Sequence, residues 1–282
     1  MSDQQENYGG SFAQKVIWIT GASSGIGEAL TKIFARCGAK MVLSARTEAG
    51  LQRVRNECIA AGASGEDLLV LPLDIVDYDA MPGAVASVLE AFTRIDMLIN
   101  NAGMSQRSFC LDTNMDVYRS MLEVNVIGQI ALTKLVLPTM VEQGSGHLVV
   151  TSSVAGKVGV PLRTGYCAAK HAVMGFFDAL RTEVAYLGIR VSTVVPGFIR
   201  TNISTNALTG TGEKFTQEDA NIAGGMDVDE AAQVIARGLA DGVEEIAVGA
   251  GEEMTLLDLK RSDPTQTFRV MESMAEQIRS EL

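Results

Sequence analysis

A glycine-rich turn near the start of the chain restricts its fold more than any other feature. The turn reads TGASSGIG at residues 20–27 and joins the β-rich run KVIWIT to EALTKIFARCGA, in which apolar residues recur at helical spacing. Glycines there permit a tight turn and a close approach of the backbone to a pyrophosphate, which the N-terminus of the next helix attracts. Such turns also serve plain packing, but the position after the first strand favours nucleotide binding. The predicted contacts are Gly21, Ser23, Ser24, Gly25, Ile26 and Gly27.

The alternation of β-rich and helical stretches continues along the chain. The seven β-rich runs are KVIWIT, KMVLSA, DLLVLPLD, DMLINNA, HLVVTSS, RVSTVVPG and EEIAVG. Helical periodicity in the stretches between them predicts a parallel sheet that is covered on both faces. The expected fold class is therefore α/β, a doubly wound sheet of seven mainly parallel strands with helices on both faces. Ligands of such sheets bind at the carboxyl ends of the strands.

A single domain is expected, because 282 residues with 47% apolar content can bury one large core. Residues 1–14 are polar and glycine-containing, which predicts a flexible lead-in to a domain at 15–250. Inside this domain, residues 199–226 are rich in Thr, Asn and Gly; a loop of this length predicts a substrate lid or a disordered segment. Residues 251–282 have helical periodicity and are expected to dock on the domain or to contact a partner.

Charge and composition exclude several kinds of partner. The net charge of −11, from 23 basic and 34 acidic residues, opposes general binding to nucleic acid or anionic membranes. The four cysteines show neither metal-ligand spacing nor a disulfide framework, so no metal site is expected. The polar N-terminus has no signal-peptide core, and we expect no run of about 20 apolar residues that spans a membrane. We expect a soluble, cytoplasmic protein.

The end of the second β-rich run bears on which nucleotide binds. An acidic residue about 20 residues past the glycine motif would hold the ribose hydroxyl of NAD. Ala45 occupies that position, and Arg46 follows with a fixed charge suited to a 2′-phosphate, which favours NADP(H). The alternative is a solvated arginine at a strand end. Ser44 is a second candidate phosphate contact, and Asp74 is either an acceptor for the adenine amino group or a helix cap.

Tyr166 and Lys170, in TGYCAAKHAV, form the candidate catalytic pair. Four residues separate them, so both side chains lie on one face of a helix. An ammonium group beside a phenol favours the phenolate and lowers the tyrosine pKa toward the range used in proton transfer. The alternative is two surface side chains that merely pass each other.

Six motifs in order resemble the short-chain dehydrogenase/reductase family. They are TGASSGIG at residues 20–27, NNAG at 100–103, VN at 124–125, SS at 152–153, YCAAK at 166–170 and PG at 196–197. The resemblance covers about residues 15–249 and implies a Rossmann-type fold with a catalytic tetrad of Asn125, Ser153, Tyr166 and Lys170. Ser153 and Tyr166 are thirteen residues apart, which is the family's usual interval.

In the mechanism that this resemblance implies, Tyr166 donates a proton to a carbonyl oxygen and Ser153 hydrogen-bonds the same oxygen. Lys170 lowers the tyrosine pKa and binds the nicotinamide ribose, while Asn125 holds a water that links the lysine to solvent. The resemblance also implies cofactor contacts outside the glycine turn. These are Asn101, Ala102, Gly103, Tyr166, Lys170, Pro196, Gly197, Ile199 and Thr201.

The stretch around Tyr166 resembles the branch of hydroxysteroid and retinol dehydrogenases. The expected substrate contacts are Ser153, Tyr166, Met104, Val154, Val160, Leu162 and Phe198. Most are apolar, which favours a hydrophobic carbonyl or alcohol. The leading hypothesis is an NADP(H)-dependent carbonyl reductase that acts in either direction. The alternatives are a 3-oxoacyl thioester reductase and a non-catalytic NADP-binding regulator.

Two further expectations concern residues outside the candidate site. His147, at the start of the fifth β-rich run, and His171 are expected to be structural. His171 follows Lys170, and adjacent helix positions point about 100 degrees apart, so its side chain should leave the catalytic face. The family often pairs through the helices that carry Asn125 and Tyr166, so the resemblance implies a homodimer or homotetramer.

Overall fold

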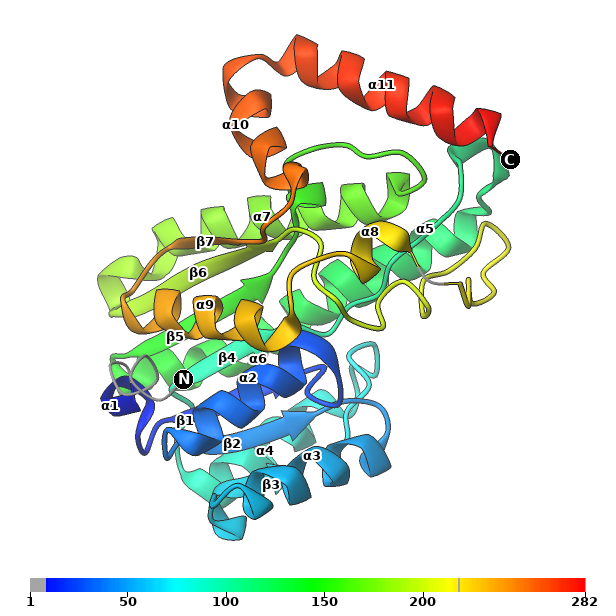
Figure 1. Cartoon of the computed structure of the whole chain (residues 1–282). Coiled ribbons are helices and arrows are strands. Elements are labelled where there is room, and N and C mark those ends of the chain that lie inside the picture. The colour runs from blue at the N-terminus through cyan, green and yellow to red at the C-terminus, as the bar shows by residue number, and fades with distance from the viewer. Residues whose placement is uncertain (1–8, 218, 282) are drawn as a thin grey trace.

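Within residues 9–217 and 219–281, which the computed structural model describes, seven strands form one parallel sheet (Figure 1). Their spatial order is β3-β2-β1-β4-β5-β6-β7, and every neighbouring pair is parallel. The strands are β1 Val16–Thr20, β2 Lys40–Ser44, β3 Leu68–Val70, β4 Met97–Asn100, β5 Gly146–Thr151, β6 Ile189–Pro196 and β7 Glu245–Val248. The predicted doubly wound, single-domain α/β fold is confirmed. The strand order reverses between β1 and β4, which is where ligands of such sheets bind.

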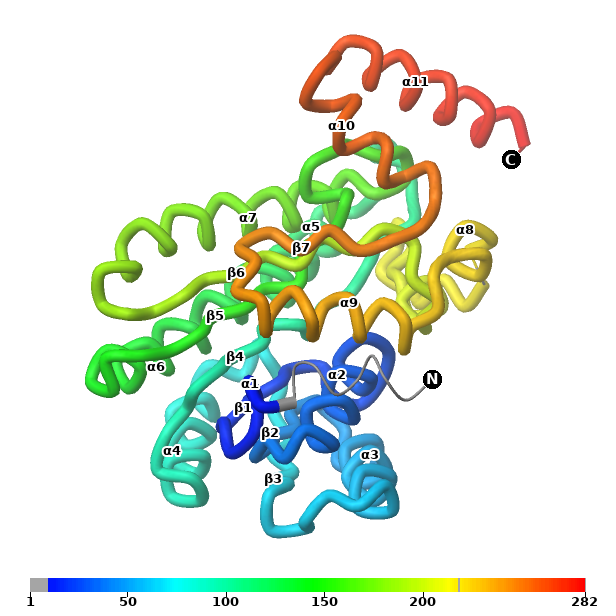
Figure 2. Tube along the Cα trace, turned by 60° about the vertical axis from the view of Figure 1, so that its left-hand side comes forward, coloured from blue at the N-terminus to red at the C-terminus, as the bar shows by residue number. Residues whose placement is uncertain are grey.

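Helices cover both faces of this sheet (Figures 1 and 2). The principal helices are α2 Gly25–Arg36, α3 Glu48–Ala60, α4 Met81–Phe92, α5 Met115–Leu122, α6 Gly128–Gln143, α7 Thr164–Val184 and α9 Val228–Ala240. Apolar side chains of α2, α3 and α9 form one core with the sheet, and those of α4, α6 and α7 form the other. Because both faces are buried, strands such as β1 and β4 are buried at every position and read as continuous apolar runs.

The third β-rich run forms a shorter strand than its sequence predicts. Only residues 68–70 of DLLVLPLD lie in β3, because Pro72 has no N–H to donate to a ladder. Leu71 and Leu73 still donate to carbonyl oxygens along β2, at 2.9 and 3.0 Å. The segment therefore follows the sheet edge as far as Asp74.

A π-helical segment, Glu123–Ile127, joins α5 to α6 and makes them one continuous helix. Among the described residues, this Met115–Gln143 helix is long and apolar enough to cross a membrane by length and composition, contrary to the expectation that no segment would be. Its most apolar window is 44% buried in the protein. Leu132, Val136 and Met140 are buried in the core beneath the sheet, so this helix is part of the domain's packing.

The N-terminal boundary differs from the prediction. Residues 1–8 of the expected lead-in lie outside the described residues, but residues 9–12 form a short helix, α1 Gly9–Phe12. The Phe12 side chain is buried, and its ring lies 4.6 Å from that of Phe34 on α2. Packing of this aromatic pair holds residues 9–14 on the domain.

The C-terminal residues form two helices, α10 Thr255–Ser262 and α11 Pro264–Ser280, which rise above α7 (Figure 1). Met271 of α11 is buried against Val154 and Val158 in a small apolar cluster of its own. Near the end of α11, the Arg279 guanidinium lies 5.1 Å from the centre of the Phe109 ring and 3.7 Å from the Asp112 carboxylate. The pair of helices is thus attached at both ends to the carboxyl side of the sheet.

Residues 199–226, the predicted lid, contain turns and one short helix, α8 Ala220–Ala223. Two backbone hydrogen bonds close the segment at its base: Arg200 N donates to the Met226 carbonyl at 3.0 Å, and Met226 N donates to the Phe198 carbonyl at 2.9 Å. Its middle is docked through Leu208, whose N–H donates to Ser105 O and whose carbonyl accepts from Arg107 N, both at 2.8 Å. The segment therefore lies on the loop that follows β4.

The packing of α6 generates a stability prediction. A Cβ on Gly128 would collide with the backbone carbonyl of Ile75, so Gly128→Ala is expected to destabilise the protein by about 1–3 kcal/mol. A Cβ on Gly83 of α4 would meet nothing within 4 Å, so Gly83→Ala is expected to stabilise by up to about 1 kcal/mol through helix propensity. Chemical denaturation of the two variants measures both signs. Equal effects of the two substitutions would contradict the packing argument.

Candidate active site

The glycine turn leaves no room for side chains at its first and third glycines. Gly21 has a φ of +70°, and a Cβ there would lie 3.0 Å from Ala102 Cα. A Cβ on Gly27 would collide with the Gly21 carbonyl and lie 2.6 Å from Asn101 Nδ2. Gly25 has a φ of +57°, and a Cβ there would lie 3.2 Å from Thr201 Cγ2. The turn, the end of β4 and the start of the lid segment therefore meet at one point.

Thr20 connects the ends of β1 and β4. Its Oγ1 accepts hydrogen bonds from the N–H groups of Asn101 and Ala102, both at 3.0 Å. The Asn101 side chain donates back to the Thr20 carbonyl at 3.1 Å and accepts from Thr151 Oγ1 at 3.2 Å. This network fixes NNAG against the glycine turn.

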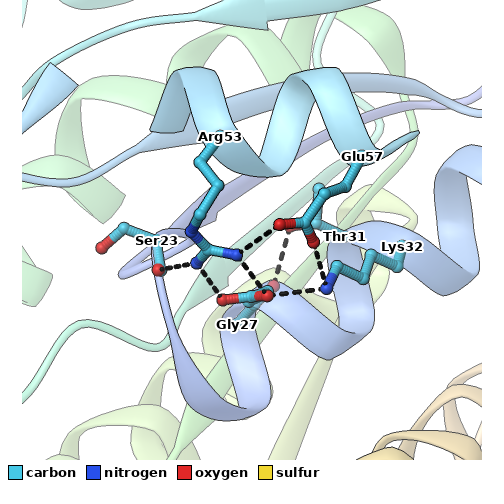
Figure 3. A network of polar contacts seen from close by, with 7 residues as sticks. Ser23, Gly27, Thr31, Lys32, Arg53 and Glu57 are labelled. Atoms are coloured by element: carbon cyan, nitrogen blue, oxygen red, sulfur yellow. Dashed lines mark hydrogen bonds and ion pairs between the residues drawn. The ribbon is translucent and has the colours of Figure 1, made fainter. Parts of the chain in front are cut away.

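Arg53 of α3 holds the turn from outside (Figure 3). Its guanidinium donates to the Ser23 carbonyl at 3.0 Å and to both carboxylate oxygens of Glu28 at 2.9 and 2.5 Å. Glu57 completes the network. Its carboxylate forms ion pairs with Arg53 at 2.8 Å and with Lys32 at 2.6 Å. The network lies at the first turn of α2, so it fixes the backbone beside the predicted phosphate position.

The turn has the features that a dinucleotide pyrophosphate needs. Ser24 is the N-cap of α2, but its side chain makes no cap hydrogen bond to the N–H groups of the first turn. The three glycines leave the backbone bare at the same place. Arg46 is exposed at the end of β2 and makes no polar contact within residues 9–217 and 219–281. These residues fit the pyrophosphate of a dinucleotide.

Two expected nucleotide contacts have other partners. The Ser44 side chain is buried, and its Oγ accepts a hydrogen bond of 2.9 Å from the Trp18 indole N–H, whereas Arg46 lies two residues beyond β2 and is exposed. The phosphate contact of Ser44 stays a prediction. Asp74 is half-buried, and its Oδ1 accepts from Val76 N at 3.2 Å, which stabilises a turn and not a helix cap. The other carboxylate oxygen is the one that could accept from the adenine amino group, and this contact stays a prediction.

Four side chains of the predicted tetrad gather at the carboxyl ends of β4 and β5. Tyr166 and Lys170 lie on α7 and are both almost fully buried, with Lys170 Nζ 5.6 Å from the Tyr166 ring centre. Ser153 follows β5; its hydroxyl donates weakly to the Pro196 carbonyl at 3.3 Å and accepts from Ala155 N at 3.1 Å, and its proximity favours the charged form of Tyr166 and so opposes the rise of the Tyr166 pKa. Lys170 Nζ donates to the Thr151 carbonyl at 2.8 Å.

Asn125 reaches the site because of the π-helical segment. Its Nδ2 donates to the carbonyl oxygens of Met121 and Met104 at 3.0 and 3.1 Å, and its Oδ1 accepts from Met104 N at 3.2 Å. A Cβ on Gly103 would lie 2.8 Å from Asn125 Oδ1 and 3.5 Å from Lys170 Nζ. Gly103 therefore allows these two polar groups to approach each other.

Burial controls the protonation of the central pair. It lowers the pKa of Lys170 to about 8. It raises the pKa of Tyr166, against the opposing effects of the Arg163 charge and the Ser153 hydrogen bond. The predicted lowering by Lys170 is therefore not found, because the low-dielectric surroundings disfavour the charged forms of both groups. In this structure Tyr166 is a neutral phenol, which is the form of a proton donor.

The expected substrate residues separate into two groups. Met104 and Val160 pack with Tyr166 and with Leu208 of the 199–226 segment. Val154 is buried with Met174, Val195 and Met271 beneath α11, and its expected role as a substrate contact stays a prediction. Leu162 is nearly buried with a φ of +64°, and Phe198 is half-buried.

Phe198 belongs to the predicted nicotinamide clamp, PGFIRT. Its N–H donates to Glu253 Oε1 at 3.0 Å, and a Cβ on Gly197 would collide with the same carboxylate. Pro196 ends β6, Ile199 is buried in the core, and Thr201 Oγ1 lies 3.4 Å from the Ile199 carbonyl. The C-terminal segment thus fixes the clamp's backbone.

Both histidines have structural roles, as expected. His147 Nε2 hydrogen-bonds Ser192 Oγ at 2.9 Å, and burial lowers the His147 pKa to about 3. His171 Nδ1 lies 2.8 Å from the Cys167 carbonyl on the outer side of α7. Neither contacts the tetrad.

Several residues of the site escape sequence reasoning. Thr20 had a weak signal, since it is the first residue of the glycine motif. Arg53, Glu253 and Asp219 had none, because the site contacts of each, with Ser23, Phe198 and Arg163 respectively, join residues 30 or more positions apart in the chain. Only the fold brings such pairs together.

Fold and site define a Rossmann-type protein whose Ser–Tyr–Lys group lies at the switch point of the sheet. The sequence profile described as "short chain dehydrogenase" matches residues 15–211. The human protein named "Dehydrogenase/reductase SDR family member 7" is 41% identical over 261 residues, which are 92% of this chain and 77% of that protein. The chain belongs to the short-chain dehydrogenase/reductase family of oxidoreductases.

Solved structures agree with this assignment. A short-chain dehydrogenase/reductase from Burkholderia phymatum, in complex with NAD, superimposes with a TM-score of 0.79 at 25% identity and covers 90% of this chain and 95% of its own. A metagenomic short-chain oxidoreductase in complex with NADP gives a TM-score of 0.69 at 27% identity, with 84% and 98% covered. Related proteins of this fold thus bind either nucleotide.

Burial of Lys170 predicts a pH-dependent stability. Its pKa in the folded state is about 8, below the ordinary 10.5, so the unfolded chain binds more protons between these values and native stability rises with pH across this window. Lys170→Met is expected to stabilise the protein by about 1–3 kcal/mol at pH 7, because an unpaired buried charge is removed. The advantage should shrink near pH 9.5. Urea unfolding at both pH values measures it, with the exposed Lys134→Met as control; a constant advantage would contradict the argument.

Proposed function

We propose that the protein is an NADP(H)-dependent oxidoreductase that interconverts a carbonyl and a secondary or primary alcohol on a largely apolar small molecule. The observation that carries this proposal is the buried group of Tyr166, Ser153 and Lys170 beside the glycine turn. It lies where a doubly wound sheet binds nucleotides. When bound, the nicotinamide supplies or accepts the hydride.

The nucleotide would be held by groups from four strand ends. The glycine turn, with Ser23, Ser24 and Ile26, would receive the pyrophosphate. The end of β4, at Asn101, Ala102 and Gly103, would face the adenosine ribose. Lys170 and the clamp at residues 196–201 would hold the nicotinamide side, with Asp74 near the adenine. Pairing of the buried Lys170 ammonium with ribose hydroxyls would offset part of its cost of burial.

In carbonyl reduction, the Tyr166 hydroxyl donates its proton to the substrate oxygen. The raised pKa keeps this proton in place until negative charge develops on that oxygen. Ser153 exchanges its weak hydrogen bond with the Pro196 carbonyl for one with the same oxygen, which stabilises the developing charge. In alcohol oxidation the proton moves in the opposite direction, from the substrate hydroxyl to Tyr166, and Ser153 hydrogen-bonds the same oxygen.

Lys170 and Asn125 return the proton to Tyr166. With a pKa of about 8, Lys170 gives up and recovers a proton easily near neutral pH. Asn125 Oδ1 lies beside the same backbone position, Gly103, and is oriented by Met104 and Met121. We infer that a water held there connects Lys170 with solvent.

The preference for NADP(H) rests on Arg46. Ala45 offers no carboxylate to the ribose hydroxyl, and Arg46 is exposed without a polar partner in the described chain. Since structures of related proteins hold either NAD or NADP, this residue is the feature that favours one over the other. Met104, Val160 and Leu208 beside Tyr166 support an apolar substrate.

Tyr166→Phe tests the chemistry. We expect turnover of a responsive carbonyl with NADPH to fall by about 10²- to 10⁴-fold, because the proton donor is lost while the ring packing remains. Steady-state rates over a carbonyl panel measure the effect, and the exposed Tyr186→Phe is the matched control. Full turnover by Tyr166→Phe would refute the mechanism. A wild-type protein that binds NADPH but reduces nothing in the panel would favour the non-catalytic regulator.

Arg46→Ala tests the nucleotide preference. Loss of a charge-assisted contact to the 2′-phosphate is expected to weaken NADPH binding about 10- to 100-fold and to leave NADH binding unchanged. Titrations that follow reduced-nicotinamide fluorescence at one salt concentration measure both affinities. Arg36→Ala, at the far end of α2, controls for the change in net charge. Equal affinity of the wild type for NADPH and NADH would contradict the preference.

A further inference from the structure

A buried carboxylate joins three segments next to the tetrad. Asp219, in the 199–226 segment, is 3% exposed, and its Oδ2 accepts from Arg163 Nη2 at 2.8 Å and from Arg107 Nη1. Its Oδ1 accepts from Asn221 N at 3.1 Å, so the same side chain caps α8. We call Arg107, Asp219 and Arg163 the ion triad.

The two arginines come from fixed parts of the domain. Arg163 immediately precedes α7 and stands three residues before Tyr166. Arg107 lies in the loop after β4, where its guanidinium is 5.2 Å from the centre of the Phe215 ring and its N–H donates to Leu208. The ion triad therefore fastens residues 199–226 to both sides of the predicted substrate position.

The ion triad carries one net positive charge close to Tyr166. Its carboxylate balances one guanidinium, and arginine keeps its charge at every working pH. The Arg163 charge favours the phenolate of Tyr166. The other ionisable groups that face Tyr166 are Lys170 and Cys167, both on α7. Apolar side chains from other elements, among them Met121, Ala155, Met104 and Leu208, also pack around Tyr166.

Release of the 199–226 segment would disturb this arrangement. In the closed segment Asp219 is buried between two guanidinium groups, and loss of either partner would leave a poorly compensated buried charge, so the closed position depends on both ion pairs. Opening would also remove the anion that orients the Arg163 guanidinium. Closure of the segment and the proton affinity of Tyr166 are therefore coupled through one side chain.

We propose that Arg163 is a positioning residue of the reaction, held by Asp219, which links closure of the 199–226 lid to a fixed positive charge beside Tyr166. This inference rests on the proposed function for its catalytic part, whereas the closure of the lid can be measured without turnover.

The charge is tested by the pH dependence of alcohol oxidation, which needs the phenolate. Arg163→Met removes a cation that favours the phenolate, so the rising limb of kcat against pH is expected to move up by about half a pH unit or more. Arg163→Lys keeps the charge and should stay close to the wild type. Arg181→Met is the matched control, because Arg181 lies on the same helix, is 21% exposed compared with 16% for Arg163, and also pairs with carboxylates.

The role of the ion triad as a latch, which holds residues 199–226 closed, is tested by hydrogen exchange of peptides that span these residues. Asp219→Asn keeps an acceptor for the α8 cap but removes the charge, and Arg163→Met removes its partner. Each is expected to speed exchange, and the double variant should exchange no faster than the faster single variant. Arg181→Met should leave exchange unchanged.

The outcomes separate the two parts of the argument. Unchanged exchange in both single variants, or additive effects in the double variant, would refute the latch. Faster exchange with an unmoved pH limb would make Arg163 merely structural and overturn its positioning role. Failure of the wild type to turn over any carbonyl or alcohol would refute the proposed function, while the exchange experiment would still decide the latch.

Discussion

Close contact between the end of β1 and the end of β4 is the constraint on which the rest of the site depends. Thr20 Oγ1 accepts two backbone N–H groups of NNAG, and Asn101 donates back to the Thr20 carbonyl. This contact packs Gly21 against Ala102. It leaves no space for a side chain at Gly27, the third glycine of the motif. From there, Gly103 lies beside Asn125 and Lys170, so the nucleotide side and the proton-transfer side share one piece of backbone.

The site combines groups that are costly to bury. Within the described residues Lys170 Nζ donates to the Thr151 carbonyl and to no other group, and burial of this poorly compensated charge lowers the Lys170 pKa. Asp219 is buried by contrast with two cations. The first arrangement leaves a group ready to exchange protons, and the second leaves a rigid contact. The same low-dielectric interior therefore has two effects. It makes the Lys170 proton easier to lose, and it strengthens the ion pairs that hold Asp219 in place.

Local patterns were sufficient to predict the fold, because strand runs and glycine turns each occupy a few neighbouring residues, whereas the four tetrad residues were predicted as a set only through the family resemblance. Local patterns do not predict side-chain orientations that depend on distant partners. Ser44 turns to Trp18, Val154 is covered by Met271, and Phe12 packs on Phe34. The π-helical segment that directs Asn125 inward has no periodicity of its own, and the burial that raises the Tyr166 pKa exists only in the assembled domain.

The strand order also has a consequence for how the chain folds. β2 and β3 pair with their neighbours over short stretches of chain, but β1 joins β4 across 81 residues, as the Thr20–Asn101 hydrogen bonds record. Contacts between such distant segments cost much loop entropy and form slowly. The two halves of the sheet can thus collapse separately before they meet at the β1–β4 seam. We therefore expect the candidate site, which lies at this seam, to be among the last parts of the domain to assemble and the first to be affected by kinetic traps during folding.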